Sequence, residues 1–399
     1  MTPLAIGAFT LTTAAGRGRA AHVGALQRER SGLAPQAVEG CRLSTWVGEV
    51  AGLEAPLAGS LAGSLAGSLA DWDCRNNRLA LAALEQDDFR AAVDRRRARF
   101  GAARIAVFIG TSTAGVQATE RAYRERDRAA ATLPAWFRHR QTHNAFSAAH
   151  FVRTVLGLAG PSCTISTACS SSAKVFAAAS RALAAGHCDA AVVGGVDSLC
   201  LTTLYGFHSL QLISGAPCRP SDAQRDGLSI GEGAGFALLE RGDAEFRLLG
   251  YGESSDAHHM STPDPQGRGA RAAMRAALAR AQLDASDIDY INLHGTATPA
   301  NDLAEDRAVC GEFGTQVPRS STKGWTGHTL GAAGIVEAAL SLLCIQQGWL
   351  PRSLNTQAKD PAIEGHILLE SRAAPVRHVL SNSFGFGGSN CVLVLGGCA

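Results

Sequence analysis

The chain has 399 residues, of which 46% are hydrophobic, 18% charged and 6% aromatic, and its net charge is +2. This length allows one large domain or two ordinary ones with a sizeable core, and the composition argues against a disordered chain. The small net charge gives no sign of a nucleic-acid-binding protein, and no run of about 18 uncharged apolar residues predicts a membrane span.

The first third of the chain predicts a strand, two helices, a buried strand and a small-residue turn, at residues 4–11, 18–30, 77–99, 104–109 and 110–115. The N-terminal segment is apolar but lacks an early positive charge, so we expect the first strand there and not a signal peptide. Residues 58–70 contain the sequence AGSL three times and are expected to form a surface loop.

The remainder of the chain alternates strands with helices. We expect strands at 162–167, 190–193, 236–240, 290–293, 317–321, 379–383 and 391–395, and helices at 170–185, 269–281, from Asp302 onward and at 330–346. This alternation predicts an α/β fold with parallel sheets and helices on both faces. The rhythm repeats, which indicates a duplication, so we expect halves at residues 1–245 and 246–399 that pack as one unit.

Eleven cysteines occur without a CxxC pair. In a chain without a signal peptide, this usage predicts free thiols in the reducing cytoplasm and disfavours a structural zinc site. The most apolar stretch, 330–343, is too short for a membrane span and contains Glu337. We therefore expect a cytoplasmic protein with neither a membrane nor a nucleic acid as partner.

Cys169 follows the predicted strand 162–167 and precedes the predicted helix 170–185. The free N–H groups of a helix N-terminus favour a thiolate and can also hold an oxyanion. Only small residues follow the cysteine, so a substrate can approach the sulfur. A buried cysteine that only fills space is the alternative, and the spacing alone does not decide between the two.

Two histidines, His294 and His328, lie at predicted strand ends, where open α/β sheets collect their ligands. A surface or core role is the alternative for each, as it is for His258 and His259. A zinc site formed by Cys169, His294 and His328 is a further alternative, although a nucleophilic cysteine explains more of the pattern.

The last two predicted strands are joined by a turn with three glycines, at Gly385, Gly387 and Gly388. Glycines allow positive φ and a close approach of the backbone. A tight hairpin is the simpler interpretation. Phosphate binding is disfavoured because neither a lysine nor a helix follows, as they do in a P-loop.

Taken together, these segments resemble the β-ketoacyl-[acyl-carrier-protein] synthases of the thiolase-fold condensing enzymes. The motifs occur in the family's order and span roughly residues 105–396: Thr167-Ala168-Cys169-Ser170-Ser171, Cys218-Arg219-Pro220, Arg225-Asp226-Gly227, Gly231-Glu232-Gly233-Ala234-Gly235, His294-Gly295-Thr296, Lys323 with Thr326-Gly327-His328, Gly331-Ala332-Ala333-Gly334 with Glu337, and Asn382-Ser383-Phe384-Gly385-Phe386-Gly387-Gly388. The cysteine and two histidines are similar to those of the elongating members.

The resemblance implies a five-layered α-β-α-β-α fold from two duplicated halves, no metal, no cofactor, and a decarboxylative Claisen condensation. Cys169 would hold an acyl chain as a thioester, and malonyl-carrier protein would lose CO₂ and attack it. His294 and His328 would donate hydrogen bonds to the enolate oxygen. Lys323, paired with Glu337, would hold His328.

Further roles follow from the same resemblance. The N–H groups of Phe386 and Cys169 would form an oxyanion site, and the Phe386 ring would gate the acyl tunnel. Thr296 and Thr298 would bind the phosphopantetheine arm of an acyl carrier protein. The second partner would be another subunit, in a homodimer or in a heterodimer with a related ketosynthase-like chain. Four charged residues would be structural: Asp222, Arg225, Asp226 and Glu232.

Three departures from the family pattern put the acyl chain length in doubt. Thr113 stands where an apolar residue caps the acyl pocket, Ser221 where Phe is usual, and Trp325 where a smaller residue is common. A carrier protein is acidic, so we expect a basic active-site mouth, although a solvated helical face is the alternative. The candidates are Arg121, Arg124, Arg126, Arg128, Arg138 and Arg140.

Two other functions remain as alternatives. A non-catalytic subunit that shapes the acyl tunnel of a heterodimer typically lacks the nucleophile, whereas this chain keeps Cys169, His294, His328 and Lys323. A thiolase uses a second catalytic cysteine near the C-terminus. Cys391 is present, but it follows the glycine-rich turn inside a predicted strand.

Overall fold

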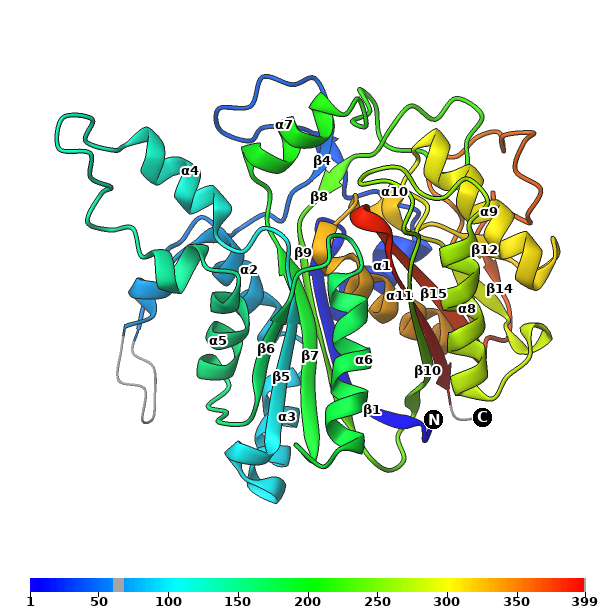
Figure 1. Ribbon diagram of the computed structural model, residues 1–399, viewed down its shortest axis with the longest axis horizontal. Coiled ribbons are helices and arrows are strands. Elements are labelled where there is room, and N and C mark those ends of the chain that lie inside the picture. The colour runs from blue at the N-terminus through cyan, green and yellow to red at the C-terminus, as the bar shows by residue number, and fades with distance from the viewer. Residues whose placement is uncertain (60–67, 398–399) are drawn as a thin grey trace.

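The computed structural model describes residues 1–59 and 68–397, so residues 60–67 of the AGSL repeat lie outside the described residues. One long sheet crosses the molecule in the order β12-β11-β15-β16-β10-β1-β9-β7-β5-β6, with β2 paired to β1 (Figure 1). Its strands are β1 (Leu4–Thr13), β2 (Gly16–Arg17), β5 (Ile105–Gly110), β6 (Ser162–Ile165), β7 (Ala190–Asp197), β9 (Gly233–Glu240), β10 (Phe246–Ser255), β11 (Tyr290–Asn292), β12 (Arg319–Ser320), β15 (His378–Gly385) and β16 (Ser389–Gly397).

The sheet consists of two five-stranded groups with the same pairing pattern. From β6 through β5, β7 and β9 to β1, two parallel pairs are followed by two antiparallel pairs, and the order from β12 through β11, β15 and β16 to β10 repeats this. The expectation of parallel sheets is therefore wrong for half of these pairs. β9 is buried along its whole length, so its apolar run has the character of a parallel strand although it runs antiparallel.

Helices separate and cover the two groups of strands. The outer helices on one side are α2 (Arg75–Leu84), α3 (Phe89–Phe100) and α5 (Phe146–Val155), those in the middle are α6 (Ser171–Ala184) and α11 (Ala333–Gln347), and those on the other side are α8 (Arg268–Ala281) and α9 (Pro299–Phe313). β16 shows how alternation makes the layers: Cys391, Leu393 and Leu395 pack toward α6 and α11, whereas Val392 and Val394 pack toward α8.

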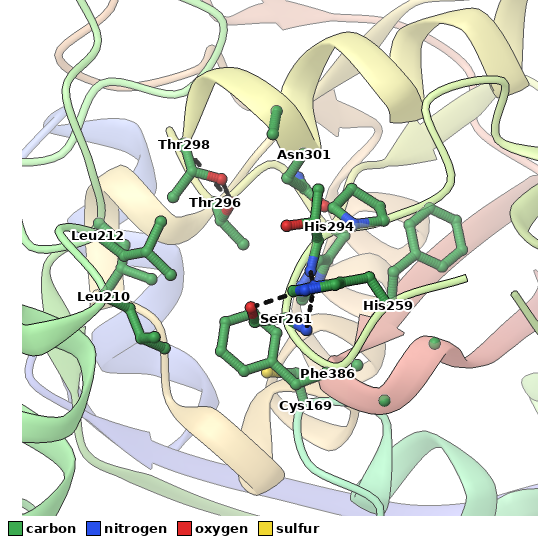
Figure 2. Close-up of a pocket in the computed structure, with 18 of the residues that line it drawn as sticks. Cys169, Leu210, Leu212, His259, Ser261, His294, Thr296, Thr298, Asn301 and Phe386 are labelled. Carbon is green, nitrogen blue, oxygen red and sulfur yellow. Dashed lines mark hydrogen bonds between the residues drawn. The ribbon is translucent and has the colours of Figure 1, made fainter. Parts of the chain in front are cut away.

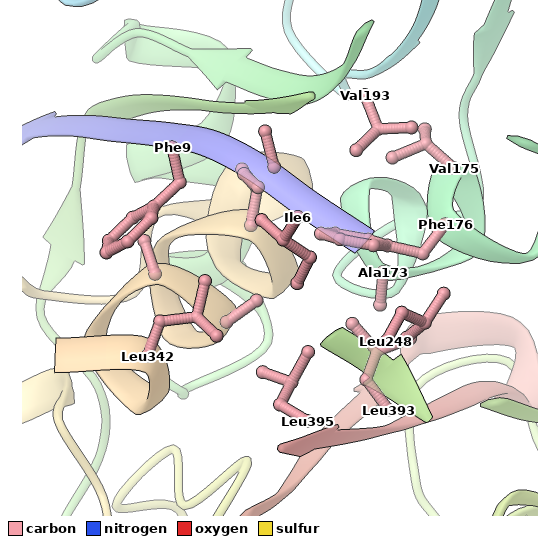
Figure 3. Packing of buried hydrophobic residues seen from close by; sticks show 14 of the residues in the cluster. Ile6, Phe9, Ala173, Val175, Phe176, Val193, Leu248, Leu342, Leu393 and Leu395 are labelled. Atoms are coloured by element: carbon pink, nitrogen blue, oxygen red, sulfur yellow. The ribbon is translucent and has the colours of Figure 1, made fainter. Parts of the chain in front are cut away.

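The middle layer carries a continuous core. Figure 3 shows Val175 and Phe176 of α6 and Leu342 of α11 between residues of both strand groups, such as Ile6 and Leu393. The five-layered α-β-α-β-α fold is thereby confirmed. The division at residues 245 and 246 stays a prediction.

Smaller elements complete the described chain. They are α1 (Gly18–Gln27), α4 (Val116–Arg124), α7 (Leu201–Ser209), α10 (Lys323–Thr326), β3 (Ala34–Pro35), β4 (Trp46–Gly48), β8 (Ile230–Gly231), β13 (Trp349–Leu350), β14 (Arg372–Ala373), and the short helical turns η1 (Leu69–Trp72), η2 (Ala102–Arg104), η3 (His139–His143), η4 (Ala285–Asp287), η5 (Leu330–Ala332) and η6 (Phe386–Gly388).

The single helix expected at 77–99 is wrong, because α2 and α3 are separate. Asp87 and Asp88 lie between them, each with φ +55°, a conformation that ends a helix. The Asp87 carboxylate also accepts the backbone N–H of Arg19 at 3.0 Å, which fixes this break against α1.

Among the described residues, the stretch Leu330–Gln347 is long and apolar enough to cross a membrane, with a mean hydropathy of 1.4. It extends beyond the 330–343 segment that was expected to be too short. Within the protein 83% of this stretch is buried, which is the environment of a core helix. Glu337, in the middle of this stretch, forms an ion pair with Lys323.

Candidate active site

Cys169 lies between β6 and α6, at the carboxyl end of the strands (Figure 2). Ala168 has φ +52°, so the chain turns sharply just before the cysteine. Ser171 holds this turn, because its Oγ accepts the N–H of Thr167 at 2.9 Å and donates to the carbonyl of Ala168 at 2.5 Å. The small residues after Cys169 therefore stabilise the turn in addition to leaving space at the sulfur.

The two candidate histidines converge on that sulfur. His328 Nε2 lies 3.1 Å from Cys169 Sγ, and the ring centroids of His294 and His328 are 5.3 Å apart with an interplanar angle of 83°. One N or S atom from each of the three side chains lies within 4.8 Å of the others, and all three residues are buried. The sequence places these residues 125 and 159 positions from the cysteine, and the fold brings them together.

Lys323 contacts His294 and not, as expected, His328. Its Nζ lies 3.4 Å from His294 Nδ1, donates to the His294 carbonyl and forms an ion pair with Glu337 Oε1. His328 is held by its backbone, whose N–H donates to the carbonyl of Ser229 at 2.8 Å. The pairing of Lys323 with Glu337 is as predicted, but the imidazole beside this pair is that of His294.

Burial dominates the ionisation of the cysteine. It raises the pKa of the Cys169 thiol from 9.0 to about 11, although Lys323 and the Phe386 N–H act to lower it. The expectation of a favoured thiolate is therefore wrong for the free protein. Burial and the charge of Lys323 also lower the pKa of His294 and of His328 well below 6.5. Both imidazoles are neutral at pH 7, and His328 is placed to accept the thiol proton.

A pocket of about 150 Å³ leads to Cys169. Its apolar wall includes Phe207, Leu210, Leu212 and Leu228, and its polar wall includes Thr296, Thr298 and Asn301 at the start of α9 (Figure 2). The Thr296 and Thr298 hydroxyls hydrogen-bond each other at 2.9 Å. The pocket thus has one side suited to an apolar group and one suited to a polar chain such as an amide-containing arm.

Phe386 lies at the base of this pocket. Its ring packs on that of Phe207 with a centroid distance of 5.4 Å, and its backbone N–H faces the Cys169 sulfur. The hairpin expected at the glycine-rich turn is confirmed, because β15 and β16 pair antiparallel up to Gly385 and Ser389. This hairpin places an aromatic ring and a backbone N–H beside the thiol.

Two residues at the site were not singled out as functional from the sequence. Glu305 of α9 is buried and accepts the N–H groups of His294 and Gly295, each at 2.7 Å, so it fixes the turn that carries His294. Burial raises the pKa of Glu305 to about 7. His259 lines the exposed side of the pocket, where its Nδ1 accepts the N–H groups of Ser261 and Thr262 at 3.2 Å. In the sequence, the one indication that Glu305 fixes the His294 turn is its position in the first turns of the helix that follows His294.

Four charged residues were expected to be structural, and their hydrogen-bond and ion-pair partners do not line the pocket. Asp222 accepts the N–H of Gln357 at 2.8 Å, Arg225 pairs with Asp360 at 2.6 Å, Glu232 pairs with Arg75 at 2.5 Å, and Asp226 accepts from Ser214 Oγ at 2.7 Å. Asp226 is exposed and the other three are buried. The expectation of buried charge is therefore correct for three of the four.

The three departures from the family pattern do not line the pocket. Trp325 is 1% exposed and packs into the core between the strand groups. Ser221 has φ +65° and its N–H donates to Asp302 at 2.8 Å. The Thr113 hydroxyl donates to Asp197 at 2.8 Å. The side chains of Trp325 and Thr113 and the backbone of Ser221 are therefore committed to the fold around the site.

None of the residues that line the described pocket is arginine or lysine. Four of the six candidate arginines lie outside α4, on the segment 125–140 that follows it. α4 is joined to α7 because Glu120 accepts the N–H groups of Leu201 and Thr202, at 3.1 and 2.6 Å. A basic rim beyond the pocket stays a prediction.

A zinc ion is the alternative use of Cys169, His294 and His328. Ligand atoms at the bond lengths typical of tetrahedral zinc lie roughly 3.5 Å apart. The 3.1 Å between Cys169 Sγ and His328 Nε2 is a hydrogen-bond distance for a thiol donor and an imidazole acceptor. The donor set therefore fits a thiol and its base better than it fits a metal.

Comparison with known proteins agrees with this geometry. Residues 76–244 match the family model of the β-ketoacyl synthase N-terminal domain, and residues 246–357 match that of the C-terminal domain. The chain is 33% identical over 310 residues to 3-oxoacyl-[acyl-carrier-protein] synthase 2 of Staphylococcus aureus, covering 73% of this chain and 76% of that protein. It is 41% identical over 259 residues to the protein of the same name from Rhizobium meliloti, but this match spans only 61% of the relative's length.

Solved structures extend the similarity to the whole chain. One is a ketosynthase (ApeO) in complex with its chain length factor (ApeC) from Xenorhabdus doucetiae, with a TM-score of 0.89, 36% identity, and coverage of 100% of this chain and 98% of that one. A second is the ishigamide ketosynthase/chain length factor, with a TM-score of 0.88, 26% identity and full coverage of both chains. The motifs, the layers and these matches show that the chain belongs to the β-ketoacyl synthase family.

Proposed function

We propose that the protein is a β-ketoacyl-[acyl-carrier-protein] synthase that elongates a fatty acyl or polyketide chain. The observation that carries this proposal is the convergence of Cys169 Sγ, His294 and His328 at the base of one pocket. The proposal needs no cofactor and no metal, because the carrier protein delivers both substrates as thioesters and the side chains named supply the acid–base chemistry.

Acyl transfer starts from a neutral thiol. His328 Nε2 takes the proton as Cys169 Sγ attacks the carbonyl carbon of the acyl-carrier thioester. The N–H groups of Cys169 and Phe386 bind the oxyanion of the tetrahedral intermediate. When that intermediate collapses, the bond to the carrier's sulfur breaks, the proton passes to the departing thiolate, and the acyl group remains on Cys169.

Condensation then uses both imidazoles as hydrogen-bond donors. Malonyl-carrier protein loses CO₂, and the electron pair of the broken C–C bond moves into an enolate. The enolate oxygen accepts hydrogen bonds from His294 and His328, and removing one such donor typically costs ~3 kcal/mol of barrier. The enolate carbon attacks the Cys169 thioester and a C–C bond forms, while the C–S bond breaks and the departing Cys169 thiolate takes up a proton from water.

The walls of the pocket support these assignments. Thr296 and Thr298 line the pocket and would bind the pantetheine arm through their hydroxyls, and the Phe386 ring, packed on Phe207, would act as a gate to the sulfur. Lys323 and Glu337 keep His294 in place. We place the protein in the cytoplasm, where carrier-linked acyl thioesters and free thiols coexist.

The partners proposed are an acyl carrier protein and a second ketosynthase-like subunit. Two of the similar structures are ketosynthase/chain length factor assemblies. Among the residues that the structure describes, β6 lies at the end of the sheet, pairs only with β5 and carries exposed residues, so a neighbouring subunit has a strand edge to pair with. Native mass spectrometry of the protein alone and with a co-expressed relative would distinguish a homodimer from a heterodimer.

A Cys169→Ala variant tests the reaction. We expect it to lose condensation completely and to retain part of the decarboxylation of malonyl-carrier protein, because both histidines remain. Product masses and released CO₂, measured with acyl- and malonyl-carrier proteins, report the two steps separately. Condensation by the variant would refute the proposal, and loss of the thioester-linked acyl mass on intact protein confirms where the chain was held.

A further inference from the structure

Asp197 ends β7 with a carboxylate that has no role in the scheme above. Its side chain is fully buried, at 0% exposure. Six neutral donors reach its two oxygens, namely Thr111 Oγ1 at 2.6 Å, Ser112 N at 2.9 Å, Ser112 Oγ at 2.5 Å, Thr113 N at 2.8 Å, Thr113 Oγ1 at 2.8 Å and Gly331 N at 2.6 Å. Within the described ranges no lysine, arginine or histidine forms an ion pair with it.

These donors belong to two segments that flank the reacting pair. Residues 111–113 follow directly after β5. The end of β5 packs against the start of α6, because a Cβ on Gly110 would lie 2.4 Å from the backbone nitrogen of Ser172. The other donor, Gly331, is three residues after His328. Asp197 therefore joins residues 111–113, which pack against the start of α6 beside Cys169, to the backbone segment that carries His328.

The link between these segments is close. A Cβ on Gly331 would lie 2.8 Å from Asp197 Oδ2 and 2.8 Å from Ser112 N, so only glycine fits there. Ser112 Oγ donates to Asp197 and accepts the Gly331 N–H at 3.1 Å. The carboxylate and this hydroxyl together hold the two segments at hydrogen-bond distance, where the Cys169–His328 contact of 3.1 Å requires them.

On the basis of the proposed function, we propose that Asp197 is a positioning residue for the Cys169–His328 pair, acting through these backbone links and through its uncompensated negative charge. A fixed negative charge in a buried site opposes a thiolate and favours an imidazolium. Proton transfer from Cys169 to His328 creates both ions, so the charge acts on the thiol and on the base in opposite directions. The other charged or titratable groups that face Cys169 are His294, His328, Lys323 and Glu337.

The test compares Asp197→Asn with wild type in two measurements. We expect kcat for condensation to fall on the order of 100-fold, as for the loss of a preorganised group, with KM for the carrier substrate nearly unchanged. We also expect the pH midpoint of Cys169 alkylation by iodoacetamide, read at that peptide by mass spectrometry, to move to lower pH. A purely structural role would not move this midpoint in a folded variant.

The matched control is Asp189→Asn, just before the other end of β7, where the carboxylate pairs with Arg104 at the surface. It should leave kcat and the alkylation midpoint unchanged. Alkylation needs no carrier protein, so it tests Asp197 even if the wild type does not condense acyl thioesters, an outcome that would overturn only the proposed function.

Ser112→Ala distinguishes the effect of the hydrogen-bonded link to Gly331 from the effect of the Asp197 charge. It is the deciding variant if circular dichroism shows that Asp197→Asn does not fold. It removes the Ser112 bridge to Gly331 but keeps the carboxylate. We expect kcat to fall about tenfold, consistent with the loss of the two part-buried hydrogen bonds of this hydroxyl, with the alkylation midpoint unchanged. Wild-type kcat in Ser112→Ala, or an unmoved midpoint in a folded Asp197→Asn, would overturn the proposal.

Discussion

Lys323 and Glu337 form a buried ion pair beside His294, with side chains 2% and 4% exposed. Removing one member of such a pair leaves a buried charge without a partner, which typically destabilises a protein by about 3–5 kcal/mol. We therefore expect Lys323→Met to lower the free energy of unfolding by about 3 kcal/mol. The double variant Lys323→Met/Glu337→Leu should regain most of that loss, as measured by urea denaturation.

The double variant is also a control for function. It restores packing without restoring the cation beside His294, so it should remain deficient in malonyl decarboxylation although it is stable. A single variant as stable as the wild type would contradict the buried-pair interpretation. Full decarboxylation by the double variant would contradict the role of Lys323 in holding His294.

At the scale of single residues, motif order in the sequence identified the groups that meet at the site, but not their ionisation or their partners. The pKa of Cys169 depends on burial by segments far away in the chain, which a local pattern does not report. The contact of Lys323 with His294 in place of His328 depends on where α10, which begins at Lys323, lies relative to the turn after β11 that carries His294. Glu305 went unnoticed because a helix-start carboxylate usually serves the helix itself.

At the scale of elements, β10 shows what the sequence left out. It pairs with β1 and β16 along the middle of the sheet, yet its glycines at 250 and 252 weaken the strand signal. A Cβ on Gly252 would lie 1.8 Å from the carbonyl oxygen of Ala273. The same glycines that hide the strand therefore allow α8 to lie directly on it.

This close packing gives a prediction for Gly252→Ala. The added methyl group cannot be accommodated without moving α8 away from β10, so we expect the free energy of unfolding to fall by about 3 kcal/mol. Gly206→Ala is the matched control, because Gly206 lies within α7 with nothing within 4 Å of its ideal Cβ. That variant should be neutral or more stable by up to about 1 kcal/mol. Equal stabilities of the two variants in urea denaturation would contradict the packing argument.

Strand direction was the other element-level feature that the sequence did not determine. Alternating helices and strands correctly predicted layered α/β structure, whereas β9 and β16 run antiparallel to their neighbours β7 and β15. β9 is buried on both faces because helices cover the sheet on both sides. The hydrophobic pattern of a strand depends on which of its faces are buried, and not on whether it runs parallel or antiparallel to its neighbours.

At the scale of the whole molecule, the small-residue composition lets three layers of helices and two strand groups pack closely, and it also buries many thiols. Eight of the ten cysteines that the structure describes have a raised pKa, in each case chiefly because of burial. The values reach about 11 for Cys169, Cys200 and Cys218, and about 12 for Cys74 and Cys344. The folded protein therefore keeps protons that the unfolded chain releases above pH 9.

This difference predicts that the fold is sensitive to alkali. Between pH 9 and 11 the unfolded chain binds fewer protons than the folded one, so the free energy of unfolding falls as pH rises. Each buried thiol contributes about 1.4 kcal/mol per pH unit, and these contributions are fully present below pH 9. The slope of the unfolding free energy against pH, from urea denaturation in a reducing buffer, measures the number of protons involved. Cys344→Ala should reduce that slope by about one proton. An unfolding free energy that stays constant between pH 9 and 11 would show that these thiols are not buried as described.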